Sequence, residues 1–280
     1  MTNPKKQQKI CILIATSLGR SELLFERALK SVFDQTAQPD YLIVVDDNDD
    51  DNLIPILNNY LKDRNFPCCC IKNKRTKHMS GTGAWNTGID YLSTILGENA
   101  YVCILDDDDT WDSNYIATIK EYISRDTEPI DAVFAYINRE DCPSPLVFDK
   151  CDLKVESFLI GNPGIQGSNM VFRLSCLNEI NGFDENLSSC TDRDLLIRFL
   201  EKFGNERVHI IPNVLTFYHV TKKSVTYDLK KKSDGLDYFF SKHIKRFTSF
   251  KVLDQSLKRA ELLFKYPHRN KIESLYFSKP

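Results

Sequence analysis

The sequence has no apolar run long enough to cross a membrane. The run at residues 10–15 follows a basic start, but it is too short for the apolar region of a secretory signal. There are nine cysteines, an odd number, and no two are spaced as Cys-x-x-Cys. This argues against a disulfide scaffold and against a zinc site. We therefore expect a soluble, cytoplasmic chain with reduced thiols, including the triplet at 68–70 in what reads as a buried strand.

Glycine and proline are also scarce, with 11 of each in 280 residues, which excludes a collagen-like or disordered chain. The length suits one large α/β unit with an appendage. Charge is uneven, because residues 219–280 hold 15 Lys and Arg against 6 Asp and Glu while the whole chain has a net charge of −2. Such a basic segment would bind an anionic partner, which could be a membrane surface, a phosphorylated acceptor or nucleic acid. The alternative is a solvated helix rich in lysine. Of these we do not expect nucleic acid.

Short apolar runs alternate with segments of helical periodicity. The runs predict strands at 9–16, 40–47, 66–73, 100–109 and 131–140, with helices between the first four. Strands buried on both faces and joined by helices indicate an open, mostly parallel α/β sheet, a Rossmann-like nucleotide-binding core. Further along, the pattern predicts a helix entered near Asp192, a final strand pair in 208–220, and one long helix after 234 with an apolar and a basic face.

Acidic side chains follow the fourth predicted strand directly. The stretch VCILDDDDTW, residues 102–111, ends its apolar run in four aspartates, and each pair of such charges repels by roughly 0.7 kcal/mol at about 6 Å in water. Ligands of open α/β sheets bind at the carboxyl ends of the strands, and carboxylates prefer Mg²⁺ or Mn²⁺. A cation at Asp106 and Asp108 is one interpretation, and a solvated turn is the other.

Residues 104–111, ILDDDDTW, resemble the DxD segment of the family 2 inverting glycosyltransferases. Four further segments are similar to this family in order and spacing: ILIATSLGRSELLFERALKSVFDQT, YLIVVDDNDDD, GTGAWNTGID and INGFDENLSSCTDRDLLIRF. The resemblance covers roughly residues 9–225. It implies a GT-A fold with a sugar-nucleotide-binding half at 1–125, an acceptor-binding and catalytic half at 126–225, and a basic helical extension at 226–280.

The resemblance also implies the reaction and the residues that carry it. A sugar would move from a nucleotide-diphosphate donor, a UDP-sugar first of all, to a hydroxyl of a glycan or lipid-linked acceptor in surface polysaccharide or glycolipid synthesis. Mn²⁺ or Mg²⁺ is expected on Asp106, Asp108, Asp109 and His219, and the catalytic base is expected at Asp192. Donor contacts are expected from Thr16, Arg20, Asp46, Asp47, Lys77, Asn86 and Asp107. Acceptor contacts are expected from Trp111, Gly167, Ser168 and Asn169. The basic extension would give peripheral contact with the inner face of a membrane.

Three positions depart from the family pattern. Asn48 stands where the family has glycine, and it still tolerates a tight turn, while the other two bear on the site. Trp85 stands where arginine is common, and Thr191 where glutamate is frequent. The candidates to replace the lost cation are Lys74, Arg75, Lys77 and His78. The change at 85 leaves open a non-catalytic module that only binds sugar nucleotides. Structural alternatives also remain, since Asp46 and Asp47 could cap the following helix and both tryptophans could line the core.

A phosphatase is the rival enzyme class. The letters ILDDDDT also satisfy the nucleophile motif of the haloacid-dehalogenase-like phosphatases, in which Asp106 would attack phosphorus and Asp108 would act as the acid. Those enzymes complete their magnesium site with a later Gly-Asp segment, and this sequence contains no Gly-Asp dipeptide. The transferase interpretation is therefore the stronger of the two.

Overall fold

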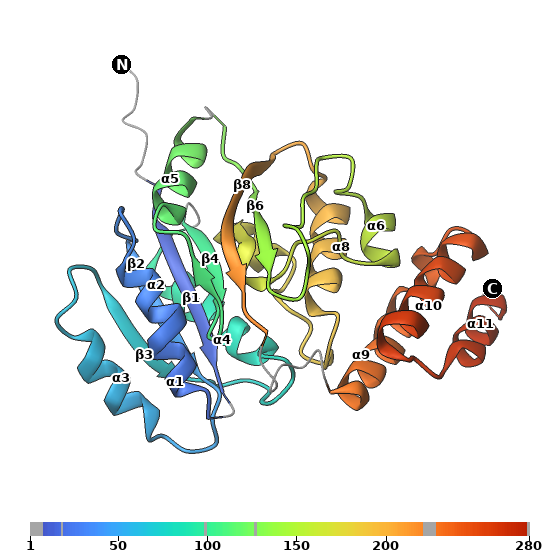
Figure 1. Cartoon of the computed structure of the whole chain (residues 1–280), viewed down its shortest axis with the longest axis horizontal. Coiled ribbons are helices and arrows are strands. Elements are labelled where there is room, and N and C mark those ends of the chain that lie inside the picture. Colours follow the sequence, from blue (N-terminus) through green and yellow to red (C-terminus); the bar gives the residue numbers. More distant parts are fainter. Residues whose placement is uncertain (1–7, 18, 98–99, 126–127, 221–227, 279–280) are drawn as a thin grey trace.

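The structure, a computed structural model, describes residues 8–17, 19–97, 100–125, 128–220 and 228–278. Through these residues runs one sheet of eight strands, in the order β3-β2-β1-β4-β7-β6-β8-β5, with helices on both faces (Figure 1). The carboxyl-terminal helices pack at one end, beside α6 (Val155–Ile160) and α8 (Thr191–Phe203). The predicted open α/β sheet with a helical extension is confirmed. The predicted boundaries near 126 and 225–226 lie outside the described residues and stay a prediction.

The amino-terminal half of the sheet is parallel. Strand β1 (Ile10–Thr16) pairs with β2 (Tyr41–Asp46) on one side and with β4 (Tyr101–Asp106) on the other, and β2 pairs with β3 (Cys68–Lys72). The apolar runs of β1, β2 and β4 are buried because helices cover both faces. Strand β3 forms the edge, and of its cysteines only Cys70 is buried, so the prediction of a buried triplet is wrong for the other two. All nine cysteines are free.

The other half of the sheet is mixed. Strand β7 (Met170–Arg173), which the sequence pattern does not predict, lies antiparallel between β4 and β6 (Ala132–Arg139). Strand β8 (Val208–Tyr218) runs parallel to β6, and the short β5 (Thr110–Trp111) closes the edge antiparallel to β8. The prediction of a strand pair at 208–220 is therefore wrong. A single strand shifts its register around Pro212, because proline has no N–H for the ladder.

The sheet divides the core into two apolar layers, and helices cover each of them. One face of the sheet carries the helical run Ser21–Phe33 (α1, η1 and α2), α3 (Leu53–Leu61) and α5 (Tyr115–Arg125). The other carries α4 (Thr82–Ile95), α6 (Val155–Ile160), α7 (Leu174–Glu179) and α8 (Thr191–Phe203). Helix α4 lies close on β1 because Gly88 has no side chain, and a Cβ there would come within 2.2 Å of Leu13 Cδ1.

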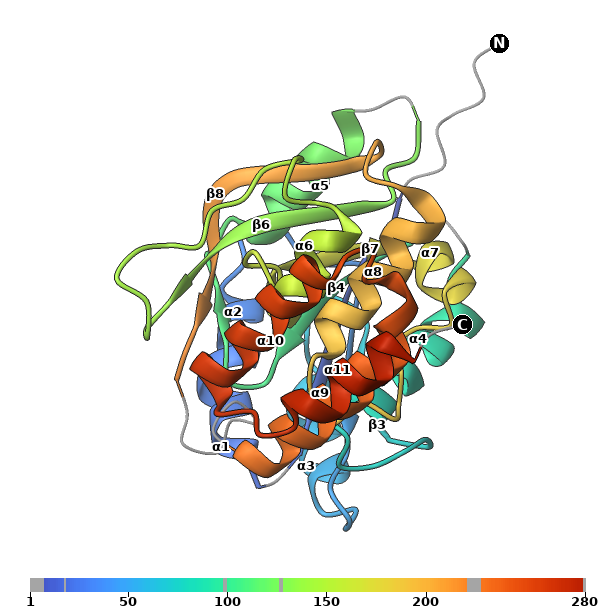
Figure 2. The same ribbon diagram turned by 90° about the vertical axis from the view of Figure 1, so that its right-hand side faces the viewer.

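The basic carboxyl-terminal segment folds as three helices, so the prediction of one long helix is wrong. They are α9 (Leu229–His243), α10 (Phe250–Phe264) and α11 (Arg269–Phe277), and the 3-10 turn η4 (Ile244–Arg246) follows α9. Ser249 starts α10 anew, since its side chain accepts the N–H of Val252. Figure 2 shows these helices from their outer side.

The apolar face predicted for this segment is part of the protein core. Its buried members are Leu236, Phe240, Ile244, Phe247, Leu253 and Leu257. This face is therefore not free to bind a membrane. Among the described residues, no helix has both the length and the apolar character needed to span a bilayer.

A buried carboxylate joins the carboxyl-terminal helices to the rest of the fold. Asp194 of α8 contacts Arg198 of its own helix at 2.8 Å, and Lys242 and His243 of α9 at 2.5 and 2.9 Å. Burial disfavours the charge of Asp194, but the hydrogen bond from His243 and the charge of Arg198 hold its pKa well below the usual range. The carboxylate is thus a charged link between α8 and α9.

Asp194→Asn is expected to lower the free energy of unfolding by about 3 kcal/mol, because it leaves Arg198 without its counter-charge and Lys242 with Asp184 alone. Urea denaturation followed by circular dichroism measures this. Asp234→Asn is the matched control, since Asp234 forms an exposed pair with Lys230, and its unfolding midpoint should equal that of the wild type. Equal destabilisation of both variants would contradict the role of Asp194 as a buried link.

Candidate active site

A pocket of about 220 Å³ opens at the carboxyl edge of the sheet. Its walls come from the turns after β1, β2 and β4, the start of α4, residues 166–167, and the amino ends of α8 and α9. Seven of the predicted site residues line it: Thr16, Arg20, Asp47, Asp106, Asp108, Gly167 and Asp192. The structure thus brings residues expected to serve the donor, the metal, the acceptor and the proton transfer into one cavity.

Arg20 and Thr16 hold the acidic turn after β4. Arg20 Nη2 lies 3.0 Å from Asp107 Oδ1, and its Nη1 lies 3.2 Å from Asp108 Oδ2. Thr16 Oγ1 donates a hydrogen bond to Asp107 Oδ2 at 2.7 Å. Asp107 is fully buried, so its carboxylate supports the turn, whereas Asp106 and Asp108 line the pocket.

Asp109 and His219 lie behind this turn. Asp109 accepts hydrogen bonds from Ser168 Oγ at 2.5 Å and from the backbone N–H of His219 at 3.0 Å. The imidazole of His219 has other partners, because its Nε2 lies 2.9 Å from Thr110 Oγ1 and its Nδ1 lies 2.6 Å from Glu140 Oε1. The structure therefore does not bring the Asp109 carboxylate or the His219 ring to the pocket lining, where the expected metal set would need them.

The acidic turn carries more negative charge than Arg20 offsets. Burial and the carboxylates of Asp109 and Asp108 raise the pKa of Asp106 well above its usual value. Burial, partly opposed by Arg20, raises the pKa of Asp107 to about 7. Burial and the charge of Asp108 raise the pKa of Asp109 to about 8. Crowded, buried carboxylates of this kind suit a divalent cation, which would stabilise their ionised forms.

The two aspartates at the end of β2 differ in their surroundings. Asp47 lines the pocket and accepts hydrogen bonds from Asn73 Nδ2 at 2.5 Å and from the N–H of His78 at 3.2 Å. Asp46 is fully buried, accepts hydrogen bonds within its own turn and pairs with Lys72 at 3.1 Å. Asp47 therefore borders the pocket, although it is buried, while Asp46 supports the turn.

The remaining donor candidates, Lys77 and Asn86, do not line the pocket. Lys77 Nζ donates to the backbone oxygen of Asn48 at 3.1 Å. Asn86 of α4 exchanges hydrogen bonds with the backbone of Phe183 at 2.8 and 2.9 Å. Both residues hold the loops around the pocket in place and do not form part of its surface.

Of the four expected acceptor residues, Gly167 lines the pocket. A Cβ at this position would lie 3.1 Å from Asp106 Oδ2, so glycine keeps that carboxylate accessible. Ser168 and Asn169 are fully buried, and Asn169 donates to two backbone carbonyl groups at 2.7 and 2.9 Å. Trp111 is also buried and donates its Nε1–H to Ser168 O at 2.6 Å. These three side chains support the wall behind Gly167.

Asp192 is the second residue of α8 and faces the same cavity as Asp106. Burial raises the pKa of Asp192 to about 6, and the nearby charge of Lys232 opposes that rise. At neutral pH the group is therefore mostly ionised. A carboxylate with these properties is suited to accept a proton from a bound hydroxyl group.

Residues 12–180, more than half of the chain, match the sequence profile described as Glycosyl transferase family 2. The chain belongs to glycosyl transferase family 2. The match includes the turns after β1, β2 and β4 and ends before Asp192. The resemblance noted in the sequence is thereby confirmed, and the protein is a nucleotide-sugar glycosyltransferase. The phosphatase and the non-catalytic module lose their support.

Solved structures of glycosyltransferases share this fold. The mannosyltransferase PcManGT from Pyrobaculum calidifontis, in complex with GDP-Man and Mn²⁺, aligns with a TM-score of 0.63 and 18% identity, covering 99% of this chain and 76% of its own. S. aureus TarS 1-349 aligns with a TM-score of 0.60 and 14% identity, covering 93% of this chain and 74% of its own. Identities this low show the fold alone, which is of the GT-A type. Comparison with curated protein sequences gave no significant match.

Other residues of this glycosyltransferase line the pocket without having been assigned to it from the sequence: Ser80, Gln166, Ser189, Tyr218, Lys231 and Lys232. His78, one of the four candidates to replace the arginine lost at Trp85, also lines the pocket, and so does Trp85 itself. Lys74, Arg75 and Lys77 do not. For the two lysines of α9, the excess of basic residues in the carboxyl-terminal segment is the feature of the sequence that indicates binding of an anion.

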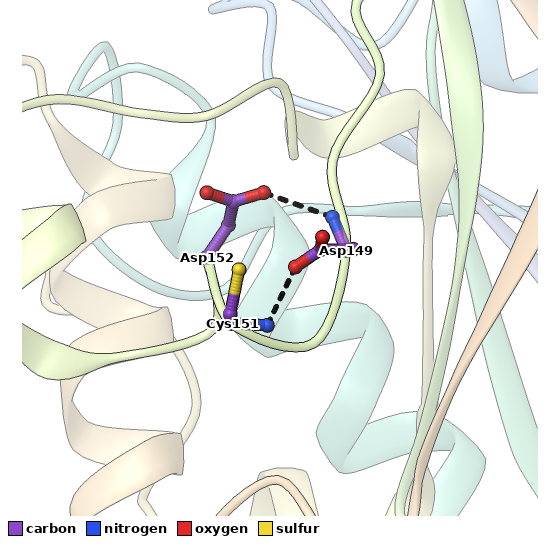
Figure 3. A group of neighbouring side chains, drawn as sticks. All are labelled: Asp149, Cys151 and Asp152. Atoms are coloured by element: carbon purple, nitrogen blue, oxygen red, sulfur yellow. Dashed lines mark hydrogen bonds between the residues drawn. The ribbon is translucent and has the colours of Figure 1, made fainter.

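A second group of possible metal ligands lies outside the pocket, in the loop after β6. Asp149, Cys151 and Asp152 place ligand atoms within 4.8 Å of one another (Figure 3). Both carboxylates accept backbone N–H groups of the same loop, Asp152 from Asp149 at 2.9 Å and Asp149 from Cys151 at 2.7 Å. These hydrogen bonds account for the arrangement, so we assign no metal to it.

Proposed function

We propose that this family member is a metal-dependent, inverting glycosyltransferase that moves a sugar from a nucleotide-diphosphate donor to a hydroxyl acceptor. The observation that carries the proposal is the convergence of Asp47, Asp106, Asp108 and Asp192 on one pocket at the carboxyl edge of the sheet. Each has a different task in such a reaction, and the strands and helices that present them come from separate parts of the chain.

The donor would bind with its nucleoside at Asp47 and its diphosphate near the turn after β4. A UDP-sugar is our first choice. Two proteins of the same fold have been solved with nucleotide ligands, TarS 1-349 with UDP and with UDP-GlcNAc, and PcManGT with GDP-Man. Asp46, Asp107, Lys77 and Asn86 would act on the donor indirectly, by holding the turns that surround it.

Asp106 and Asp108 would hold Mn²⁺ or Mg²⁺. They line the pocket, they are oxygen ligands of the type these ions prefer, and the raised pKa of Asp106 reflects its burial and the neighbouring carboxylates, whose charge a cation would offset. When bound, such a cation stabilises the charge that develops on the leaving diphosphate. Asp109 and His219 would support the site from behind, since Asp109 accepts the His219 N–H.

Asp192 would act as the general base. Its carboxylate would take the proton of the acceptor hydroxyl, whose oxygen then attacks the anomeric carbon from the face opposite the diphosphate. The new glycosidic bond forms as the bond to the diphosphate breaks, so a single displacement inverts the anomeric centre. Gly167, which leaves space next to Asp106, would let the sugar approach.

The acceptor would be a glycan or a lipid-linked molecule in surface polysaccharide or glycolipid synthesis, with the enzyme working from the cytoplasm. Peripheral contact with a membrane stays part of this proposal, but it would need surfaces other than the buried face of α9 and α10. The large apolar side chains that the carboxyl-terminal helices expose are Leu229, Tyr238, Phe250, Leu262, Leu263, Leu275 and Phe277.

Calorimetric titration with UDP-sugars and GDP-Man tests the donor and the metal together. With Mn²⁺ present, we expect binding of at least one nucleotide sugar, because the cation joins the acidic turn to the diphosphate. A chelator should weaken this binding about tenfold or more, and added Mn²⁺ should restore it. Unchanged affinity after chelation would contradict metal dependence, and an absence of heat with every nucleotide sugar would refute the donor assignment.

A further inference from the structure

Two lysines of the carboxyl-terminal extension reach the pocket. Lys231 and Lys232 lie in the first turn of α9 and line the cavity together with Asp192. The loop that precedes α8 holds their backbone there. Ser188 Oγ donates a hydrogen bond to Lys231 O at 2.8 Å, and Ser189 Oγ donates one to Lys232 O at 3.3 Å. The position of these lysines is therefore set by the fold.

Neither ammonium group has a carboxylate partner within the part of the chain that the structure describes. By contrast, Lys230 in the same turn pairs with Asp234 at 2.8 Å, and Lys242 at the end of α9 pairs with Asp194. Lys232 Nζ lies 4.4 Å from the ring centre of Phe264. The charge of Lys232 acts on the Asp192 carboxylate without a direct ion pair. Half-buried cations at the wall of a pocket that form no ion pair are suited to an anionic ligand.

The neighbours of the two lysines indicate which substrate carries that anion. The diphosphate of the donor belongs at the turn after β4, with Asp108 and Arg20. The lysines lie instead with the amino end of α8, next to Asp192. Because Asp192 must meet the acceptor hydroxyl, the molecule nearest the lysines is the acceptor.

We propose that Lys231 and Lys232 bind a phosphate group that the acceptor carries close to its reacting hydroxyl. This inference rests on the proposed glycosyltransferase function and adds the chemical class of the acceptor, which is a phosphorylated molecule and not a neutral sugar. The phosphate oxygens would accept hydrogen bonds from both ammonium groups and place the hydroxyl at Asp192. Those two cations would also offset the repulsion between the phosphate and the Asp192 carboxylate.

Binding of glycerol 3-phosphate to the protein saturated with UDP and Mg²⁺ tests this inference. UDP occupies the diphosphate position, so the probe reports on the remaining site. We expect the wild type to bind glycerol 3-phosphate but not glycerol, and binding should weaken as salt rises. The double variant Lys231→Met with Lys232→Met should bind the probe about tenfold or more weakly, since each of the two lost hydrogen bonds contributes roughly threefold or more. Its affinity for UDP should stay within about twofold of the wild type.

Two further variants make the result specific. Lys230→Met is the matched control, because Lys230 lies in the same turn but does not line the pocket, and it should bind the probe like the wild type. Lys231→Met alone removes one ammonium group without disturbing the contact of Lys232 with Phe264. This single variant replaces the double variant in the binding test if the double variant is unstable. It should bind the probe about threefold or more weakly than the wild type.

Two outcomes would overturn the inference while the proposed function stands. One is a wild type that binds UDP but not glycerol 3-phosphate. The other is a double variant that loses UDP and probe affinity equally, which would assign the lysines to the donor diphosphate. If the wild type binds neither UDP nor GDP, the proposed function is refuted, and the inference falls with it.

Discussion

Asp192→Asn is expected to lower kcat by about 10³-fold while the affinity for the donor stays within about twofold of the wild type. A general base contributes roughly 10²- to 10⁴-fold to a reaction, and the amide of asparagine has the same shape but cannot accept the proton. Initial rates of UDP release with acceptor present measure the first effect, and calorimetry with UDP measures the second. Asp63→Asn is the control, because Asp63 is exposed and outside the pocket, and it should keep full activity.

The same variant should change the pH dependence of the reaction. Burial raises the pKa of Asp192 to about 6, and only the ionised carboxylate can act as a base. In the wild type, kcat/KM should therefore fall as the pH drops below about 6 and level off above it. Burial and the opposing charge of Lys232 from α9 set this value, and the charge of Asp192 in turn raises the pKa of Asp106 from β4. A fall of the same size and position in Asp192→Asn would show that another group controls the rate.

Much of the sheet follows from the sequence because its strands are continuous apolar runs. Strands β1, β2 and β4 each end in polar residues, and parallel strands place those ends at one edge. That reasoning puts Asp47, Asp106 and Asp108 near one another, and the structure places all three on the pocket. Strand β7 is less visible to such reasoning, since it has four residues within a loop-rich stretch.

Side-chain direction within the site could not be derived in this way. Four successive aspartates in a turn cannot all face one cavity, and local partners decide which ones do. Thr16 and Arg20 bind the carboxylate of Asp107, and Ser168 donates a hydrogen bond to Asp109. The ring of His219 is likewise turned by Glu140, which is 79 residues away in the sequence. Periodicity carries no information about these competing contacts.

The carboxyl-terminal helices show the same limit on a larger scale. The sequence shows an apolar pattern after 234, but the period of this pattern cannot show whether one helix continues or the chain folds back as a second helix. Ser249 and its bond to Val252 start a separate helix, and the ion pairs of Asp194 fix α9 against α8. Only this packing brings Lys231 and Lys232 to the pocket, so their link to the site is a tertiary property.

Asp108→Asn is expected to weaken the binding of Mn²⁺ by about 100-fold, since residues that merely orient metal ligands already contribute roughly 10- to 100-fold. Asp108 lines the pocket, and asparagine keeps its size while removing the negative charge that attracts the cation. Donor affinity in the presence of Mn²⁺ should fall to the level of chelated wild type. Calorimetric titration with Mn²⁺, and then with the donor, measures both effects.

Asp149→Asn is the matched control for this experiment, because Asp149 belongs to the exposed group with Cys151 and Asp152 (Figure 3). Its Mn²⁺ affinity should equal that of the wild type, since its carboxylate already accepts a backbone N–H. Thermal denaturation without metal separates loss of binding from loss of folding, as Asp108 also pairs with Arg20. If Asp149→Asn loses the cation and Asp108→Asn retains it, the metal belongs to the loop after β6, and Asp106 and Asp108 do not hold it.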